Sequence, residues 1–220
     1  MGRTKTGTDL LDMLLEGGYE TDAITTIYGP PGSGKTNFAI IAALEVAKSG
    51  KKVIYADTEG GFSVERAEQI MPDYKKYLDN IIFLKPTSFE EQNKSIYQLK
   101  ELASHRIGLI IVDTISMHYR LQRNEDESHK ELRGQIKILN EIARTKDIPV
   151  LMISQVYQSF ENGVKIVGGD IISYLSKCVL EIQPLSSGNR RLRLKKHRSI
   201  PNKDMKFKII EKGIEEITPQ

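Results

Sequence analysis

The sequence predicts a single α/β domain in which helices cover both faces of a mostly parallel sheet. Short, almost continuous apolar runs alternate with amphipathic segments of helical period, and the chain ends in segments that alternate with period two. Continuous apolar runs are expected of strands buried on both faces, and strand–helix alternation is typical of doubly wound folds. We therefore expect one undivided domain over residues 1–220, with an antiparallel extension at the C-terminal edge of the sheet.

The individual elements follow from local patterns. The predicted strands are residues 24–28, 53–56, 81–84, 109–112 and 150–153. Ser88 and Glu91 form a capping box, and the apolar residues 89, 96, 99 and 103 follow it at helical spacing. Another helix carries apolar residues 132, 136, 139 and 143 and ends before Pro149.

The C-terminal segment is basic as well as alternating. Residues 191–195 and 206–209 alternate polar with apolar, and Pro201-Asn202 between them is a turn signal. We expect an antiparallel hairpin that presents Arg191, Arg193 and Lys195 on one face, with Lys196 and Arg198 extending the positive charge.

The charge of the chain is unevenly distributed. Residues 190–212 contain ten Lys and Arg against Asp204 and Glu211, a local net charge of +8, whereas the whole chain carries +3 and the remainder therefore −5. Such asymmetry favours binding to a phosphate backbone. The alternative is a solvated charged hairpin without a ligand.

Composition excludes several classes of protein. No stretch approaches the roughly 18 apolar residues of a membrane span, and the N-terminus lacks the apolar run of a secretory signal. Cys178 is the only cysteine, which excludes an intrachain disulfide and a cysteine-cluster metal site. We expect Cys178 to be a buried structural thiol and the protein to be cytoplasmic.

Residues 29–36, Gly-Pro-Pro-Gly-Ser-Gly-Lys-Thr, match the P-loop pattern G-x-x-x-x-G-K-S/T in full. A predicted strand precedes the motif and an amphipathic helix follows it, which is the context that a P-loop requires. The glycines let backbone N–H groups surround phosphates, Lys35 reaches the β- and γ-phosphates, and Thr36 supplies a hydroxyl to Mg²⁺. We expect ATP and Mg²⁺ as cofactors, and the predicted nucleotide-binding residues are Gly29, Pro30, Pro31, Gly32, Ser33, Gly34, Lys35, Thr36 and Asn37.

Three further polar residues lie at the ends of predicted strands. Asp113 ends an apolar strand and is predicted, with Thr36, to hold the magnesium. Glu59 follows the second strand and Gln155 follows the strand at 150–153, which brings both to the P-loop edge of the sheet. Glu59 is a candidate base for hydrolysis and Gln155 a candidate γ-phosphate contact.

Several segments resemble archaeal RadA and its relatives, in the same order along the chain. They are residues 6–12, 20–25, 57–62 with Glu65-Arg66, 113–120, 154–156, 167–169 and 211–215. The resemblance covers nearly the whole chain and implies the RecA-type P-loop ATPase core. By position it makes Glu59 the catalytic carboxylate, with Lys35 and Gln155 acting on the phosphates, and makes Arg66 a candidate for stacking near the adenine.

The same family binds DNA with two loops that follow the fourth and fifth core strands. Here the first loop carries Arg120 and Arg123, which suit phosphates. The second loop spans residues 157–169, in which Tyr157 and Phe160 could stack on bases. The alternative for the second loop is a segment that makes no contact with DNA.

Two departures from RadA narrow the resemblance. The chain starts at the ATPase core, without the N-terminal helical domain and the aromatic-bearing hook of RadA. The region that caps the neighbour's ATP in RadA is acidic, whereas residues 195–201 here are strongly basic. In both features the chain resembles the RadB family of short archaeal recombinase paralogues.

The resemblance implies an ATP-binding, weakly ATP-hydrolysing protein that binds DNA without sequence preference and assists homologous recombination and repair. Single-stranded or branched DNA is the expected ligand, and a RadA-type recombinase and other repair proteins are candidate partners. Two alternatives stay open: a filament-forming strand-exchange recombinase and a KaiC-like signalling ATPase.

Overall fold

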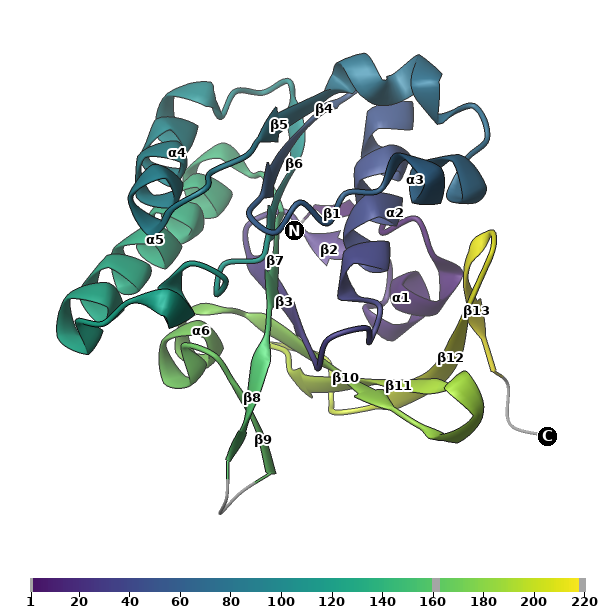
Figure 1. Cartoon of the computed structure of the whole chain (residues 1–220). Coiled ribbons are helices and arrows are strands. Elements are labelled where there is room, and N and C mark those ends of the chain that lie inside the picture. The colour runs from purple at the N-terminus through teal and green to yellow at the C-terminus, as the bar shows by residue number, and fades with distance from the viewer. Residues whose placement is uncertain (1, 160–162, 218–220) are drawn as a thin grey trace.

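The computed structural model describes residues 2–159 and 163–217, and a large twisted sheet forms its centre (Figure 1). Among the described residues, the strand order of this sheet is β13-β12-β11-β10-β3-β7-β6-β4-β5. The parallel strands are β3 (Ile24–Tyr28), β4 (Lys52–Asp57), β5 (Ile81–Leu84), β6 (Ile107–Asp113), β7 (Val150–Ser154) and β10 (Cys178–Pro184). The antiparallel extension comprises β11 (Arg190–Lys196), β12 (Asp204–Ile210) and β13 (Gly213–Glu216). The predicted fold class is confirmed.

β10 is a central strand of this sheet that the sequence patterns did not predict. It pairs in parallel with β3 and antiparallel with β11, so it joins the parallel core to the extension. Its apolar residues alternate with Glu181 and Gln183, because one of its faces is only partly covered. Cys178, at its start, is buried as expected.

Helices pack on both faces of the sheet. On one side lie α1 (Asp9–Leu14), α2 (Lys35–Lys48), α3 (Val64–Ile70) and the 3₁₀ helix η1 (Tyr74–Asn80), and on the other lie α4 (Phe89–Leu102), α5 (Glu125–Lys146) and α6 (Gly169–Leu175) (Figure 1). Each side has its own apolar core, one centred on α2 and the other on α4 and α5. The predicted capping of α4 is present, since the Ser88 hydroxyl accepts a hydrogen bond from the Glu91 amide at 3.1 Å.

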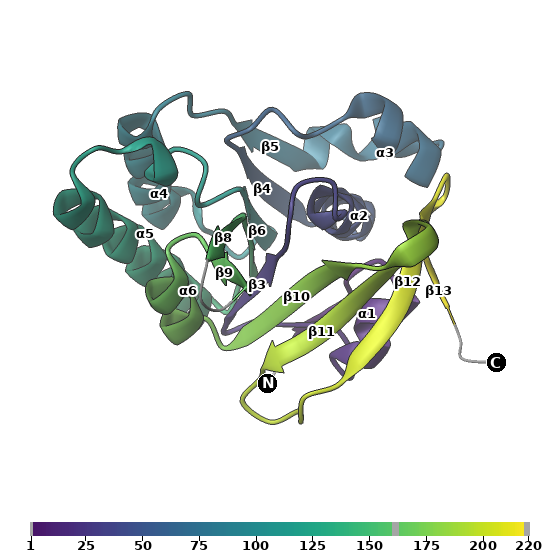
Figure 2. The same ribbon diagram turned by 60° about the horizontal axis from the view of Figure 1, so that its bottom comes forward.

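Smaller elements complete the chain. β1 (Arg3–Thr4) and β2 (Tyr19–Glu20) pair near the N-terminus, and β8 (Val156–Ser159) pairs with β9 (Gly163–Ile166). Short 3₁₀ turns, η2 (Tyr119–Leu121) and η3 (Ser186–Gly188), lie in the connections. The turned view in Figure 2 shows the antiparallel extension with α1 behind it. Within the described residues, no helix is long and apolar enough to cross a membrane.

Candidate nucleotide site and the adjoining groove

The P-loop joins the carboxyl end of β3 to the start of α2. Gly34 is the N-cap of α2 and has φ +101°, a left-handed conformation that side chains rarely adopt. A Cβ at Gly34 would lie 2.7 Å from Cδ1 of Ile209, so the extension also leaves no room for one. The sequence therefore needs glycine here for the backbone conformation and for the close approach of β12.

The polar groups of the loop fit a bound phosphate. Lys35 is 7% exposed, and its Nζ donates to the carbonyls of Gly29 and Pro30, each at 2.9 Å. An ammonium has three donors, so one remains for a ligand oxygen. The buried Ser33 hydroxyl has no hydrogen-bond partner among the described residues, although buried polar atoms normally have one. Burial lowers the pKa of Lys35, and the charges of Asp113 and Glu59 oppose that shift.

Asp113 lies at the end of β6, next to Thr36 at the start of α2. Its carboxylate accepts a hydrogen bond from the Tyr55 hydroxyl at 2.9 Å, and the Tyr55 and Thr36 hydroxyls both act to lower its pKa. Burial raises the pKa of Asp113 to about 6, and the neighbouring Glu59 and Asp57 charges act in the same direction. A desolvated carboxylate beside a hydroxyl and a phosphate loop is the donor set that Mg²⁺ with a nucleotide requires.

Glu59 follows β4 and faces the ends of β6 and β7. Its Oε1 accepts a hydrogen bond from the Thr114 hydroxyl at 2.8 Å and another from the side-chain amide of Gln155. The Oε1 of Gln155 in turn accepts from the guanidinium of Arg120. The structure therefore brings together Glu59 and Gln155 as predicted, and it adds Arg120 of the first predicted DNA loop to the same hydrogen-bonded chain.

Arg66, the predicted adenine contact, is on α3. Its Nε donates to Oδ1 of Asn37 at 2.6 Å, and its terminal nitrogens donate to backbone carbonyls of residues 210, 211 and 213 in the β12–β13 turn. The edge of the guanidinium is thus occupied by the extension, and only its planar face is free of these bonds. Stacking on adenine stays a prediction for Arg66.

Arg190 is a residue near the P-loop that sequence reasoning missed. Its guanidinium donates to the carbonyl of Gly32 at 3.4 Å and to that of Gly188 at 2.6 Å. Arg190 shares the face of β11 that carries the buried Leu192 and Leu194, whereas the basic residues considered from the sequence are those of the opposite face. The alternation could have indicated this position, but the pairing of β11 beside β10 was needed to bring it to the P-loop.

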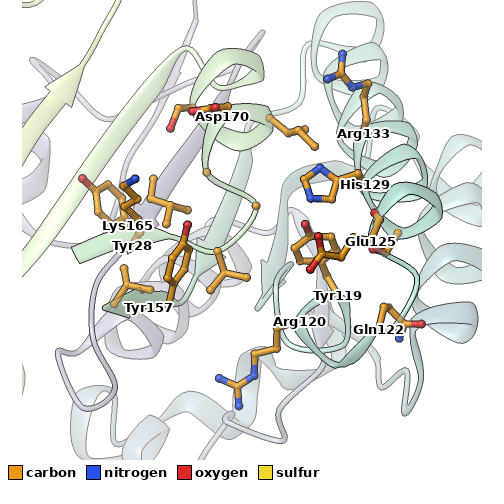
Figure 3. A pocket seen from close by; sticks show the side chains of 18 residues that line it. Tyr28, Tyr119, Arg120, Gln122, Glu125, His129, Arg133, Tyr157, Lys165 and Asp170 are labelled. Carbon is orange, nitrogen blue, oxygen red and sulfur yellow. Dashed lines mark hydrogen bonds between the residues drawn. The ribbon is translucent and has the colours of Figure 1, made fainter. Parts of the chain in front are cut away.

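A groove of about 950 Å³ opens beside this chain of hydrogen bonds (Figure 3). Tyr119 and Arg120 of η2 form one wall, and Tyr157 and Lys165 of the β8–β9 hairpin form another. His129 and Arg133 of α5 close it, and the His129 ring packs edge-on against Tyr119 with 5.6 Å between centroids. Arg123, which we predicted to contact phosphates, is exposed but does not line the groove.

The second predicted DNA loop, residues 157–169, is more regular than expected. Apart from residues 160–162, which lie outside the described residues, it contains most of the β8–β9 hairpin and reaches the first residue of α6. Tyr157 is 51% exposed, so a large part of its side chain is open to a ligand.

Carboxylates compensate much of the predicted basic surface of the extension. Arg191 Nε lies 3.1 Å from Asp204, and Lys195 Nζ lies 3.7 Å from Glu181. Arg193 has no ion pair of this kind among the described residues, although the register places it opposite Asp204 and Glu181. The face that we expected to be uniformly positive therefore has only part of its formal charge uncompensated.

Lys196 and Arg198 also differ from expectation. Lys196 Nζ donates to the carbonyl of Ser173 at 2.7 Å, at the end of α6. Arg198 makes ion pairs with Glu20 at 3.0 Å and with Asp22 at 2.5 Å. Arg198 therefore ties the end of β11 to the N-terminal segment, and its charge is compensated there. The reason is that acidic residues about 180 positions earlier fold against it.

The RecA-like order of the sheet, the P-loop and Asp113 at the end of β6 define a P-loop nucleotide-binding protein with a RecA-type core. The family model of Rad51 matches residues 2–217, and the chain belongs to the Rad51 family. Within that family it is similar to proteins named "DNA repair and recombination protein RadB", so the RadB resemblance predicted from the sequence is confirmed.

The RadB of Methanobrevibacter smithii is 42% identical over 215 residues, which cover 93% of this chain and 92% of that protein. The RadB of Methanocaldococcus jannaschii is 40% identical over 212 residues, covering 94% and 99%. A solved structure described as "Crystal structure of the RadB recombinase" is 36% identical, with a TM-score of 0.84 and coverage of 97% and 99%.

Proposed function

We propose that this chain binds ATP with Mg²⁺ at the P-loop and DNA in the groove, and that it assists recombination and repair. Proteins of the Rad51 family in general bind ATP and depend on magnesium, which supports the proposed nucleotide site. The family's role in DNA recombination and repair supports the proposed binding of DNA. The observation that carries the proposal is the hydrogen-bonded chain from Glu59 through Gln155 to Arg120. It links the nucleotide site to a wall of the groove.

At the nucleotide site, each side chain has a role that its geometry supports. The remaining N–H of Lys35 would be available to a phosphate oxygen, and the Ser33 hydroxyl would gain the partner that it lacks among the described residues. Thr36 and Asp113 would hold the magnesium, and Mg²⁺-ATP supplies the phosphoanhydride bond whose hydrolysis the site would catalyse. Asn37 and Arg66 lie beside the loop, where the base and ribose would extend toward the β12–β13 turn.

Glu59 is suited to orient the attacking water. Among the described residues, both hydrogen bonds to its side chain end on Oε1, so Oε2 is left to accept a proton from water. Gln155 holds the carboxylate and would release it when it turns to a γ-phosphate. Because that movement also breaks the bond to Arg120, nucleotide state would alter the groove.

In the groove, aromatic and basic side chains suit single-stranded DNA. Tyr157 offers an exposed ring for a base, and Arg120 and Lys165 offer charge to phosphates. A stacked base contributes about 1–3 kcal/mol, and phosphate contacts give no sequence preference. We therefore propose sequence-independent binding.

The test is the affinity of Tyr157→Ala for single-stranded DNA in ATP. We expect a loss of about tenfold, in line with the loss of one stacked base. Tyr97→Ala is the matched control, since Tyr97 is 57% exposed on α4, outside the groove. Equal affinities for the two variants and the unmodified protein would contradict DNA binding in this groove.

A further inference from the structure

A second cavity, of about 730 Å³, lies between α5 and α6 near the amino end of β10. Its walls carry the basic side chains of Lys137, Arg144, Lys177 and Lys196. All four residues are exposed, and none of them has a carboxylate within ion-pair distance among the residues that the structure describes. The cavity is therefore a region of uncompensated positive charge away from the P-loop.

The carboxylate of Glu141 does not neutralise the positive charge of the second cavity. Glu141 lines the same cavity, but its Oε2 accepts from Lys100 of α4 at 2.8 Å. That ion pair directs the Glu141 charge toward α4. Burial and the charge of Lys177 both lower the pKa of Lys196, as expected where cations gather without a counter-charge.

α5 connects this cavity to the groove. Arg133, Lys137 and Arg144 are separated by four and seven residues, a spacing that repeats on one face of a helix. Arg133 lines the groove, whereas Lys137 and Arg144 line the second cavity. At a rise of about 1.5 Å per residue, the row from Arg133 to Arg144 extends about 16 Å.

α6 lies against α5 between the two cavities. The Asn140 side chain donates to the carbonyl of Leu175 at 3.0 Å, and Ser173 lines the groove while Tyr174 lines the second cavity. The groove and the second cavity are therefore neighbours on either side of α6, and Figure 3 shows Arg133 among the side chains that line the groove. We define Arg133, Lys137, Arg144, Lys177 and Lys196 as the α5 stripe.

We propose that the α5 stripe binds the phosphate backbone of a duplex arm when a single strand of the same DNA occupies the groove. This inference rests on the proposed DNA-binding function of the groove and names the form of DNA that the protein would prefer. Along each strand of a duplex the phosphates rise about 3.4 Å per base pair, so a row of about 16 Å faces several of them.

The chemistry of the walls favours nucleic acid over a protein partner. Protein interfaces are centred on aromatic and apolar side chains with few charges. The second cavity offers Tyr174 and Leu175 but is otherwise lined by charged and polar groups. Its four basic side chains can neutralise phosphates, and Tyr174 and Leu175 are the only apolar residues that the structure describes in its lining.

The test uses Lys137→Ala, Arg144→Ala and Lys177→Ala together, none of which lines the groove. The probe is a duplex arm of about 20 base pairs with a single-stranded tail of about 15 nucleotides, beside the tail alone. The matched control removes Lys48, Lys75 and Arg106, which are exposed and line neither cavity. Affinity is measured in ATP over a range of salt.

We expect the stripe variant to bind the tailed duplex about tenfold more weakly at low salt, with the slope of log K against log salt smaller by about two to three. Its affinity for the tail alone should stay within about twofold of the unmodified protein. The control variant should match the unmodified protein on both probes. Equal salt slopes for the stripe variant and the unmodified protein on the tailed duplex would overturn the proposal.

Two other outcomes can be distinguished from equal salt slopes. If the unmodified protein binds neither the tail nor the tailed duplex, the proposed DNA-binding function fails and the stripe has no role in it. If polyglutamate binds the unmodified protein and only that binding is lost in the stripe variant, the occupant is an acidic protein segment, and the duplex proposal is wrong.

Discussion

The carboxylate of Glu59 and the guanidinium of Arg120 are joined through one side chain, the amide of Gln155. Glu59 follows β4 and Arg120 lies in η2, and Gln155 directly follows β7. Because one amide bonds both groups, it cannot turn toward a third partner without releasing at least one of them. This arrangement is the physical basis on which nucleotide state and the groove would be coupled.

Lys35→Ala should lower ATP affinity by about tenfold or more. The ammonium is the one buried cation of the loop, and losing a charged hydrogen bond costs about 1.5–3 kcal/mol. Titration calorimetry measures the effect, with the exposed Lys48→Ala at the far end of α2 as a control. Unchanged affinity in Lys35→Ala would rule out the P-loop as the nucleotide site.

Asp113→Asn should stabilise the nucleotide-free protein near neutral pH. Burial raises the pKa of Asp113 from 3.8 to about 6, so the folded state binds this proton more tightly than the unfolded chain does. Ionisation therefore opposes folding as the pH rises above 3.8, and its cost is fully present above about 6. A pKa difference of this size corresponds to a cost on the order of 3 kcal/mol.

Thermal unfolding between about pH 5 and 8 checks this sign. The stability advantage of Asp113→Asn should grow up to about pH 6 and then level off, while the stabilisation of the protein by Mg²⁺ with ATP should largely disappear. An advantage that does not change with pH would show that Asp113 is not the titrating group.

Removing Arg191, Arg193 and Lys195 together should weaken DNA binding less than the loss of three unpaired charges would. Asp204 and Glu181 already pair with two of them, so they have less charge to give to phosphates. We expect the slope of log K against log salt to fall by about one, and not by three. A decrease of about three would mean that DNA displaces these ion pairs, and no decrease would make this face a solvated surface.

The fold and the P-loop site could be predicted from the sequence because their signals are local. Buried parallel strands are apolar along their length, and the chemistry of residues 29–36 lies in one continuous segment. Asp113, Glu59 and Gln155 were predicted because each follows a recognisable strand, and the carboxyl ends of parallel strands meet at one edge.

The remaining features depend on distant parts of the chain. Arg198 resembles a free basic residue until Glu20 and Asp22 fold against it, and Arg190 reaches the P-loop only because β11 pairs with β10. The spacing of Arg133 and Lys137 is visible in the sequence, but an ordinary solvated helix face has the same spacing. Only the packing of α6 shows that this row borders two cavities.

The central claim is that Gln155 couples the nucleotide site to the DNA groove, and Gln155→Ala tests it most directly. The measurement is the affinity for a single-stranded oligonucleotide in ATP and in ADP, with Gln122→Ala as the control. Gln122 lines the same groove, but among the described residues its side chain bonds to the carbonyl of His118 alone. We predict that ATP and ADP give different DNA affinities in the unmodified protein and in Gln122→Ala. In Gln155→Ala the two affinities should become equal, with ATP binding retained. A Gln155→Ala variant that keeps the full difference between ATP and ADP would contradict the account.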